Sequence, residues 1–487
     1  MSPPAKPPAT AAKGAKASLP WRVLRSIYHR FNRRLSIRIE ELDAERRALL
    51  SRLEDLTEGD HETRQGVLND VRFMAHHMLR RGDLEGASYA FRCAKNLGRD
   101  DDPLTHQDRF LAALVPVVKS FADKRPALAA AAKSMRQKRV AISLAAWGDD
   151  YIDVFTDLLI PSLLAPGNLP ALAKDSDIVF YVVTTKEGRA RIEQSASYSL
   201  VDRYAQFEFL EFPTALAESV TNDYADGKRY WLYGALQQVT VLYAADANMD
   251  LLLMTPDTVY SDGALRNLVT LTKDHYDAVL MTSVRTVRGP ITQALRKKIG
   301  PDGALSMSSK DLLGTAMRHV HSLHQRCFMY PGNKDFLVGH VNLYWEVPGG
   351  VAVHAPHLLP AIVSRRVLKR LHIDYYTIDT NLIAAAFATD QERERLLVLP
   401  SLEGLAYIEL SPDDRQAPPS GMGFPFETHG KEHFWRHCTD LNLWIFHRRL
   451  FIPSPVQPGI GLRTLDEVDR ELAGIIADIE RQRPSSL

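Results

Sequence analysis

The chain has 487 residues, of which 45% are apolar and 24% are charged, and its 60 lysines and arginines nearly balance its 59 aspartates and glutamates. This length exceeds that of one ordinary domain and predicts two or three, with enough apolar residues to bury a sizeable core. The net charge of +1 gives no overall attraction to nucleic acid or to anionic membranes, so we expect no nucleic-acid partner.

Cysteine usage and apolar runs favour a cytoplasmic protein. Cys93, Cys327 and Cys438 are far apart and form no CxxC pair. This spacing argues against a disulfide framework or a cysteine-based zinc site and fits a reducing cytosol. No apolar stretch reaches the roughly 18 residues that span a bilayer. The N-terminus lacks the apolar segment of a secretory signal.

The first part of the chain predicts a disordered tail over residues 1–20, because Pro, Ala, Lys and Ser dominate there. Leucines then recur every seven residues from Leu35 to Leu56, which indicates a coiled-coil-like or amphipathic helix. Residues 1–38 carry nine lysines and arginines and no acidic residue. They suit peripheral contact with an anionic surface, but we favour a solvated helix beside a tail.

The next block predicts helices packed as a hairpin. Residues 65–98 resemble one tetratricopeptide-type unit, with a turn at Gly82-Asp83 and small residues at Ala87, Ala90 and Ala94. We expect a helical region over residues 21–137 that serves packing or partner contact.

The pattern changes at residue 138 to strands that alternate with helices. Apolar runs over 140–146, 178–183, 206–210, 251–254, 277–282 and 396–400 predict strands, and a further strand is expected over 347–357. The helices between them are expected over 151–164, 230–245 and 381–388. This alternation indicates a mainly parallel Rossmann-type sheet over residues 138–415. Residues 416–487 are expected to form a C-terminal extension, whose last helix follows a capping-box pattern at Thr464–Glu467.

Carboxylates and imidazoles follow several of these strands, at the edge where ligands bind in open α/β sheets. They are Asp149, Asp257, Asp374, Asp379, His354 and His357. An Asp and a His can hold Mn²⁺ or Mg²⁺ beside a diphosphate. A Walker A loop, a GxGxxG motif and a GxSxG elbow are absent from the sequence, which disfavours ATPases, dinucleotide enzymes and α/β-hydrolases.

The order of elements resembles the GT-A class of nucleotide-sugar glycosyltransferases. In that class a helix leads into an apolar strand that ends in an Asp-x-Asp motif for the metal and the donor diphosphate. The matching triplet is Thr255-Pro256-Asp257, with Asp257 at the second aspartate and Thr255 in place of the first. The resemblance implies a GT-A-like fold and the transfer of a sugar from a nucleotide-diphosphate donor to an unknown acceptor, with a protein or a glycan as candidates.

The resemblance also suggests roles for individual residues. Asp257 and His354 are the expected ligands of Mn²⁺ or Mg²⁺, and Asp379 or Asp374 is the expected catalytic carboxylate on the acceptor side. The expected donor-binding residues are Trp147, Asp149, Thr184, Tyr233, Thr255 and Asp257.

Other interpretations stay open for these residues. Thr255 removes one negative charge, which lowers the expected affinity for a divalent cation and leaves a non-catalytic binding or scaffolding protein as the alternative. Asp257 and Asp262 are also residues that turns and helix caps favour. His319, His321 and His324 have helical spacing and are expected on a solvated face.

Overall fold

The computed structural model describes residues 61–80, 82–97, 103–133, 138–221, 228–329, 342–373, 378, 380–412, 434, 438–454 and 461–481. The chain divides into two compact units, residues 1–71 and residues 72–487. The predicted tail, heptad segment and basic stretch within residues 1–56 lie outside the described residues, as do Asp374 and Asp379. The elements described below belong to the unit 72–487, apart from the first part of helix α2.

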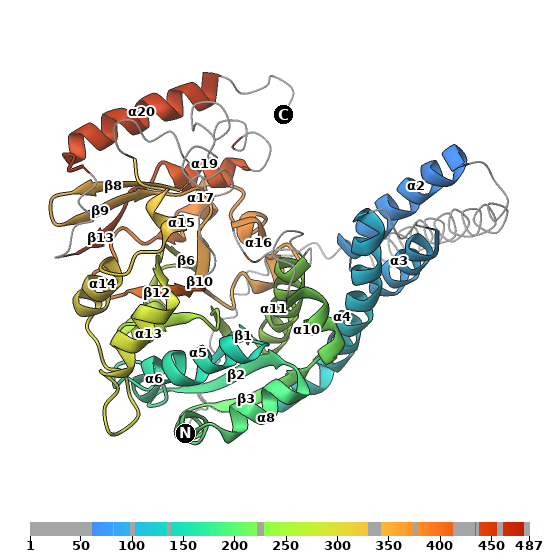
Figure 1. The fold of residues 1–487 in the computed structure, drawn as a ribbon, viewed down its shortest axis with the longest axis horizontal. Coiled ribbons are helices and arrows are strands. Elements are labelled where there is room, and N and C mark those ends of the chain that lie inside the picture. The colour runs from blue at the N-terminus through green and yellow to red at the C-terminus, as the bar shows by residue number, and fades with distance from the viewer. Residues whose placement is uncertain are drawn as a thin grey trace, which may run out of the picture. The chain divides into compact units, whose positions relative to one another are not determined.

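A seven-stranded mixed sheet forms the centre of the α/β region, in the order β11-β6-β10-β4-β1-β2-β3 (Figure 1). Its strands are β1 (Lys138–Ala145), β2 (Ser176–Thr184), β3 (Gln206–Glu211), β4 (Asp250–Leu253), β6 (Ala278–Met281), β10 (Leu359–Val363) and β11 (Leu396–Val398). Six strands run parallel, and β10 lies antiparallel between β4 and β6. The prediction of a mainly parallel α/β sheet is confirmed.

The central strands are apolar on both faces because both faces are covered. Ala141, Ile142 and Leu144 of β1 are fully buried, and Ile142 lies opposite Phe180 of β2 and Leu252 of β4. Such continuous apolar runs are typical of parallel strands that neighbouring helices cover. This explains why the apolar runs alone located these strands.

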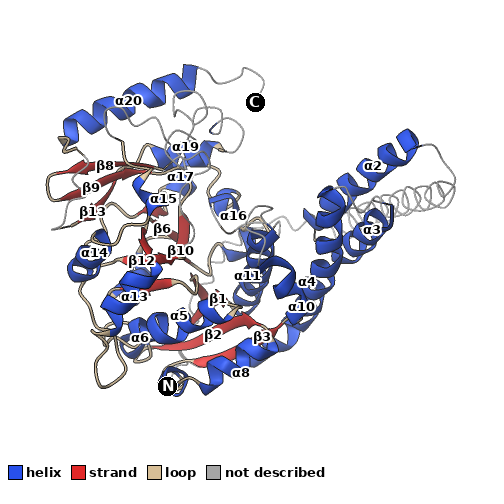
Figure 2. Cartoon of the chain, in the orientation of Figure 1, coloured by secondary structure: helices blue, strands red, loops and turns tan. Residues whose placement is uncertain are grey.

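Helices occur between most successive strands (Figure 2). They are α5 (Asp149–Val154), η2 (Phe155–Leu159), α6 (Ile160–Leu163), α7 (Leu169–Leu172), α8 (Lys186–Gln194), α9 (Ala196–Val201), α10 (Thr214–Thr221), α11 (Lys228–Ala247), α12 (Ala264–Asp274), α13 (Arg288–Arg296), α14 (Ser309–Met317), α15 (Ser322–Gln325), η3 (Leu368–Arg370), α16 (Thr380–Ala384) and α17 (Asp390–Arg393). The helix predicted over 151–164 is α5, η2 and α6 in direct succession, with a π-helical turn in the middle.

A second, three-stranded sheet contains strands that the sequence pattern did not predict. It has the order β5-β12-β7, with β5 (Thr258–Tyr260), β12 (Tyr407–Ser411) and β7 (Val284–Val287). β12 runs antiparallel to β5 and parallel to β7. These pairings join the segment that follows β4 to residues far along the chain.

A third sheet corrects the prediction of one strand over 347–357. This segment is a hairpin of β8 (Leu343–Val347) and β9 (Gly350–His354), and β13 (Leu450–Pro453) pairs with β9. Pro348 and Gly349 form the turn, in which Gly349 has a φ of 83°. Proline presets one turn position and glycine tolerates positive φ, so the chain reverses there instead of continuing as one strand.

The C-terminal segment packs on this third sheet. α19 (Asp440–Phe446) and α20 (Leu465–Arg481) contribute Phe446, Val468 and Leu472 to a core that also contains Trp345. The predicted capping box is confirmed, because Thr464 N donates to Glu467 Oε2 (2.7 Å) and Glu467 N donates to Thr464 Oγ1 (3.3 Å). Part of the predicted extension is therefore built into the core of the molecule.

The N-terminal helices are α2 (His61–Arg80), α3 (Leu84–Leu97) and α4 (Pro103–Lys133). Gly82, with a φ of 75°, forms the predicted turn between α2 and α3. α4 packs against α11, where Tyr243 Oη donates to the carbonyl of Phe121 (2.5 Å) and Arg125 pairs with Asp246 (2.8 Å). The helices from residue 72 onward thus share one compact unit with the α/β region.

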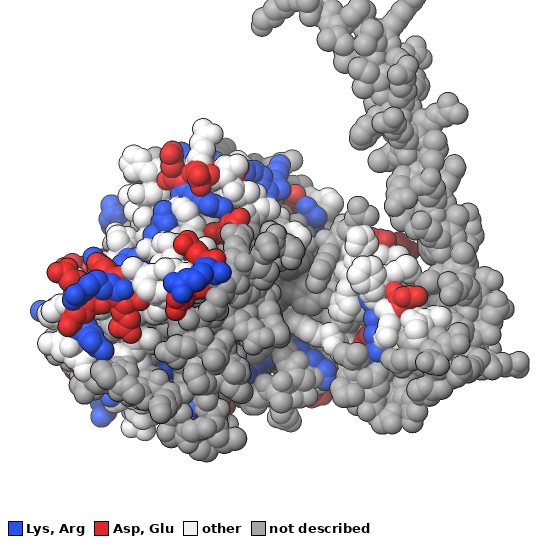
Figure 3. Space-filling model, turned by 90° about the horizontal axis from the view of Figure 1, so that it is seen from above, with Lys and Arg blue, Asp and Glu red and all other residues white. Residues whose placement is uncertain are grey.

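Two properties of the described surface bear on partners. Lys and Arg side chains alternate with Asp and Glu on the face in Figure 3, so no large patch of one sign is visible among its described residues. Within the described ranges, every helix is too short or too polar to cross a bilayer.

Candidate functional site

The carboxyl end of β4 is held in place by side chains of α11. The carbonyl oxygen of Met254 accepts hydrogen bonds from Tyr233 Oη and Gln237 Nε2, both at 2.9 Å. Met254 N in turn donates to the carbonyl of Ser143 in β1 (2.9 Å). The backbone that enters Thr255-Pro256-Asp257 is therefore fixed from two sides.

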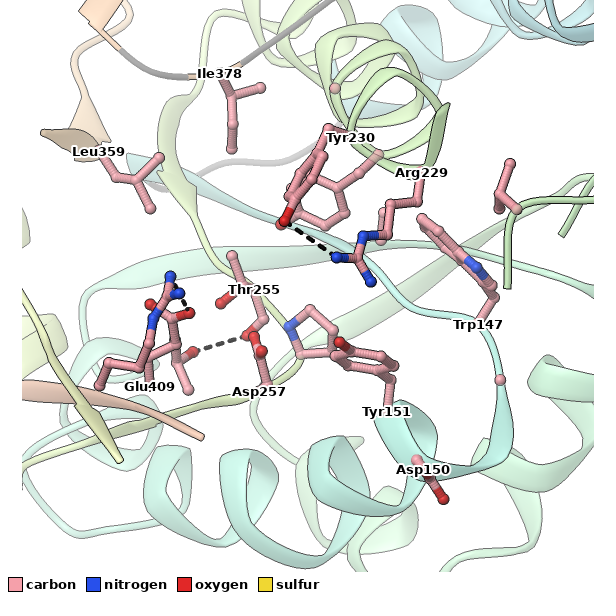
Figure 4. A pocket seen from close by; sticks show the side chains of 18 of the residues that line it. Trp147, Asp150, Tyr151, Arg229, Tyr230, Thr255, Asp257, Leu359, Ile378 and Glu409 are labelled. Carbon is pink, nitrogen blue, oxygen red and sulfur yellow. Dashed lines mark hydrogen bonds and ion pairs between the residues drawn. The ribbon is translucent and has the colours of Figure 1, made fainter. Parts of the chain in front are cut away.

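A cavity of about 550 Å³ opens at the carboxyl ends of β1 and β4 (Figure 4). Its walls come from the turn between β1 and α5, the first turns of α11, the segment between β4 and β5, and strands β7 and β12. The volume lies in the range of small-molecule and cofactor sites. Ligands of open α/β sheets bind at this edge.

The cavity brings together five of the six predicted donor-binding residues. They are Trp147, Asp149, Tyr233, Thr255 and Asp257. Thr184 is instead buried at the end of β2 and does not line the cavity. It packs against Gly188 of α8, where a Cβ atom would come within 2.3 Å of Thr184 Oγ1.

Asp257 is only partly exposed, and its surroundings disfavour its charge. Burial, followed by the negative charge of Glu409, raises the pKa of Asp257 from 3.8 to about 6. The positive charge of Arg288 and a hydrogen bond from Thr255 act in the opposite direction. The pKa of Asp257 is therefore held above its usual range, as is common for carboxylates at functional sites.

Charged residues that the sequence analysis missed surround Asp257. Arg285 of β7 pairs with Glu409 of β12 through Nη2 and Oε1 at 2.9 Å, and both residues line the cavity. Arg229, at the start of α11, stacks on the ring of Tyr230 at 4.9 Å and donates to its hydroxyl (3.2 Å). Figure 4 shows Arg229 and Tyr230 across the cavity from Asp257 and Glu409.

No local signal in the sequence pointed to Glu409 and Arg285, because their strands went unpredicted. Arg229 immediately precedes the predicted helix 230–245. A basic residue at the start of a helix that faces a sheet edge is a sequence signal by which this residue could have been found.

Aromatic side chains form much of the cavity wall. Trp147 is half-buried and contacts Phe212 at 5.9 Å and Tyr233 at 6.4 Å between ring centres. Tyr151, on the first turn of α5, also lines the cavity and lies under the guanidinium of Arg288 at 4.6 Å. Flat apolar walls of this kind suit a base or a sugar ring.

The turn between β1 and α5 depends on a glycine. Gly148 has a φ of 76° and a ψ of 142°, which is accessible in practice to glycine alone. It sets the direction in which the chain leaves Trp147 and enters the helix at Asp149. Asp149 lies at the rim, where its carboxylate is 3.5 Å from Arg191.

His354, the other expected metal ligand, lies elsewhere. It belongs to β9, where Nδ1 donates to the carbonyl of Phe446 (2.9 Å) and the ring contacts Trp345. Burial lowers the pKa of His354 to about 4. The structure therefore does not bring His354 to the cavity with Asp257, because the hairpin places it in the third sheet.

Two further predictions for single residues need correction. Asp262 does not cap α12, since Gly263 occupies that position; its carboxylate instead accepts from Gly167 N (2.6 Å) and Ser306 Oγ (2.5 Å). His321 and His324 are buried rather than solvated. His321 caps α15, which accounts for its orientation toward the backbone.

The described residues around Asp257 do not fit a divalent cation. No cluster of three or more His, Cys, Asp or Glu side chains suitable for a metal occurs within the described ranges. Glu409, whose negative charge raises the pKa of Asp257, is held in an ion pair with Arg285. A hard cation prefers several oxygen ligands, which these residues do not supply.

No known family model matches the sequence, and no curated protein matches it. The geometry and chemistry of the cavity are therefore the basis for a functional proposal.

Proposed function

We propose that this protein is a GT-A-like glycosyltransferase whose nucleotide-diphosphate sugar binds in the cavity at the ends of β1 and β4. The observation that carries the proposal is the convergence of Asp257, Trp147 and Tyr233 with the guanidinium groups of Arg229 and Arg285 in one cavity. The proposal leaves the identity of the acceptor open.

The arrangement of elements supports the proposal. α11 leads into β4, which ends at Thr255-Pro256-Asp257 and continues through β5 into α12. This is the succession on which the resemblance to the GT-A class depends. The antiparallel β10 and the second sheet surround the same segment without interrupting it.

The chemistry of the cavity matches the parts of such a donor. Aromatic faces at Trp147 and Tyr151 suit stacking on a base. Guanidinium groups bind phosphate oxygens through paired hydrogen bonds. The carboxylate of Asp257 can accept hydrogen bonds from ribose or sugar hydroxyls. In an inverting transfer a carboxylate also takes the proton of the acceptor hydroxyl, a role that we assign to Asp379 or Asp374.

Calorimetry with a panel of nucleotide sugars tests the donor site directly. We expect one donor to bind and to be consumed by transfer or slow hydrolysis. Asp257→Asn is expected to lower turnover by about 100-fold or more while the protein stays folded. The absence of binding to any nucleotide sugar would overturn the proposal.

A non-catalytic donor-binding protein is the second candidate, and the neutral Thr255 in place of an aspartate favours it. In that case a nucleotide sugar binds but is neither hydrolysed nor transferred. Release of nucleoside diphosphate, followed with a panel of acceptors, distinguishes the two functions. Turnover that disappears in Asp257→Asn decides for the enzyme.

A further inference from the structure

On the basis of the proposed function, we infer that Arg229 and Arg285 hold the donor diphosphate, in place of a divalent cation on Asp257. The charges around Asp257 do not favour a cation there. Arg285 and Arg288 both interact electrostatically with its carboxylate. Together with Glu409, these residues make a set of two carboxylates and two guanidiniums that is already neutral. A divalent cation added there would meet two positive groups and no uncommitted pair of carboxylates among the described residues.

The ion pair with Glu409 positions Arg285 without engaging all of its guanidinium donors. Its Nη2 lies 2.9 Å from Glu409 Oε1, and the two side chains are 22% and 24% exposed. A guanidinium carries five N–H donors in one plane, so a contact through one nitrogen leaves donors for phosphate oxygens. The ion pair with Glu409 thereby orients the guanidinium toward the cavity.

Arg229 approaches the same cavity from the opposite wall. It lies in the first turn of α11, a helix of 20 residues whose N-terminal end carries a partial positive charge. Stacking on Tyr230 and the hydrogen bond to its hydroxyl hold the guanidinium in place. Two guanidiniums and a helix N-terminus are a combination that favours bound phosphate.

Two further acidic residues, Asp149 and Asp150, line the cavity. Asp149 faces Arg191 at the rim. Asp150 points away from the other labelled side chains in Figure 4. Among the described residues, Arg229 and Arg285 are the two guanidiniums that line the cavity, and a diphosphate would lie between them.

Calorimetry of the full chain with UDP, GDP, ADP and CDP, in EDTA and again in Mn²⁺, tests the inference. We expect one of these nucleotides to bind with a dissociation constant that differs by no more than about twofold between the two conditions. Arg229→Gln and Arg285→Gln are each expected to weaken binding about tenfold or more. Arg296→Gln is the matched control, because Arg296 pairs with Asp157 on the exposed surface and does not line the cavity.

Loss of Arg285 leaves Glu409 unpaired, so the double variant Arg285→Gln/Glu409→Gln accompanies the single one and removes both charges. Arg229 is half-buried at a helix start, where glutamine is well tolerated. Binding that requires Mn²⁺ would overturn the inference and leave the proposed function standing. Binding in EDTA that neither arginine affects would also overturn it. Binding in neither condition would overturn the proposed function itself.

Discussion

Asp257 and His354 have pKa values displaced in opposite directions by the same cause, which is burial. For the carboxyl group, burial favours the neutral acid and raises the pKa; for the imidazole, burial favours the neutral base and lowers the pKa. Each displacement makes stability depend on pH, and the two effects oppose each other between about pH 4 and 6. The two effects partly cancel in the pH dependence of wild-type stability. Variants that remove one group at a time therefore separate them.

Asp257→Asn tests the effect at the carboxyl group. The folded protein holds the Asp257 proton up to about pH 6, whereas the unfolded chain loses it near 3.8. Wild-type stability due to this group is thus present below pH 3.8 and lost as pH rises through 6. We expect the Asn variant to gain stability relative to wild type over that interval, by at most about 3 kcal/mol. Urea unfolding of both proteins at pH 4.5 and pH 7.5 measures this gain, and a stability difference that is the same at both pH values would contradict the raised pKa.

His354→Asn tests the opposite sign. The unfolded chain binds a proton at this position below pH 6.5, whereas the folded protein does so only below about 4. The wild type therefore loses stability as pH falls from 6.5 to 4, by at most about 3 kcal/mol. Asparagine can still donate to the carbonyl of Phe446 but does not titrate. We expect the unfolding free energy of the variant to fall less than that of the wild type between pH 6.5 and pH 4. An equal fall in both proteins would refute the assignment of a buried, neutral histidine.

At the scale of single elements, the turn between β1 and α5 shapes one wall of the cavity. It joins a strand whose side chains are buried to a helix whose first residues are exposed, and the change of direction occurs at Gly148. Trp147 before it and Asp149 after it both line the cavity. The geometry of the site thus depends on one backbone conformation.

Gly148→Ala is expected to destabilise the protein by about 1–3 kcal/mol, because a Cβ atom is strained at positive φ even though the space is empty. Gly474→Ala is the matched control: Gly474 is exposed within α20 and also has empty space around its Cβ position. Alanine there is expected to stabilise by about 0.5–1 kcal/mol. Thermal unfolding of both variants checks the difference, and equal shifts would show that the turn is not strained.

At the scale of the whole molecule, the helical region and the α/β region meet along α4 and α11. Tyr243 is 1% exposed and depends on α4 for the partner of its hydroxyl. The sequence pattern predicts a boundary at residue 137, between a helical region and an α/β domain. The packing of α4 on α11 explains why the compact unit continues across that boundary.

A chain that begins at residue 138 is therefore expected to be less stable than the full chain, because the buried face of α11 becomes exposed. The milder variant Tyr243→Phe is expected to cost about 1 kcal/mol, since the hydrogen bond from Tyr243 to the carbonyl of Phe121 is lost. Tyr230→Phe, on the exposed side of the same helix, is expected to change stability by less than about 0.5 kcal/mol. Melting curves compare the four proteins, and an unchanged melting temperature for residues 138–487 would show an independent domain.

The amino-acid sequence by itself determined the elements whose pattern is local. Apolar runs located β1, β2, β3, β4, β6 and β11, and the sequence also predicted the helix before β4. The abrupt change from apolar to polar at Thr255 placed Asp257 at the end of a buried strand. Five of the six expected donor-binding residues reach one cavity because parallel strands end at a common edge.

Only the tertiary structure decided which distant segments meet. β10, β7 and β12 pair with partners far away in the sequence, and no local pattern revealed them. The same pairing brings Arg285 and Glu409 to Asp257. The turn at Pro348-Gly349 reverses the chain, so His354 lies in the third sheet and not at the cavity. A strand end can be predicted from its own residues, whereas the charges around it depend on contacts between segments that the chain order does not determine.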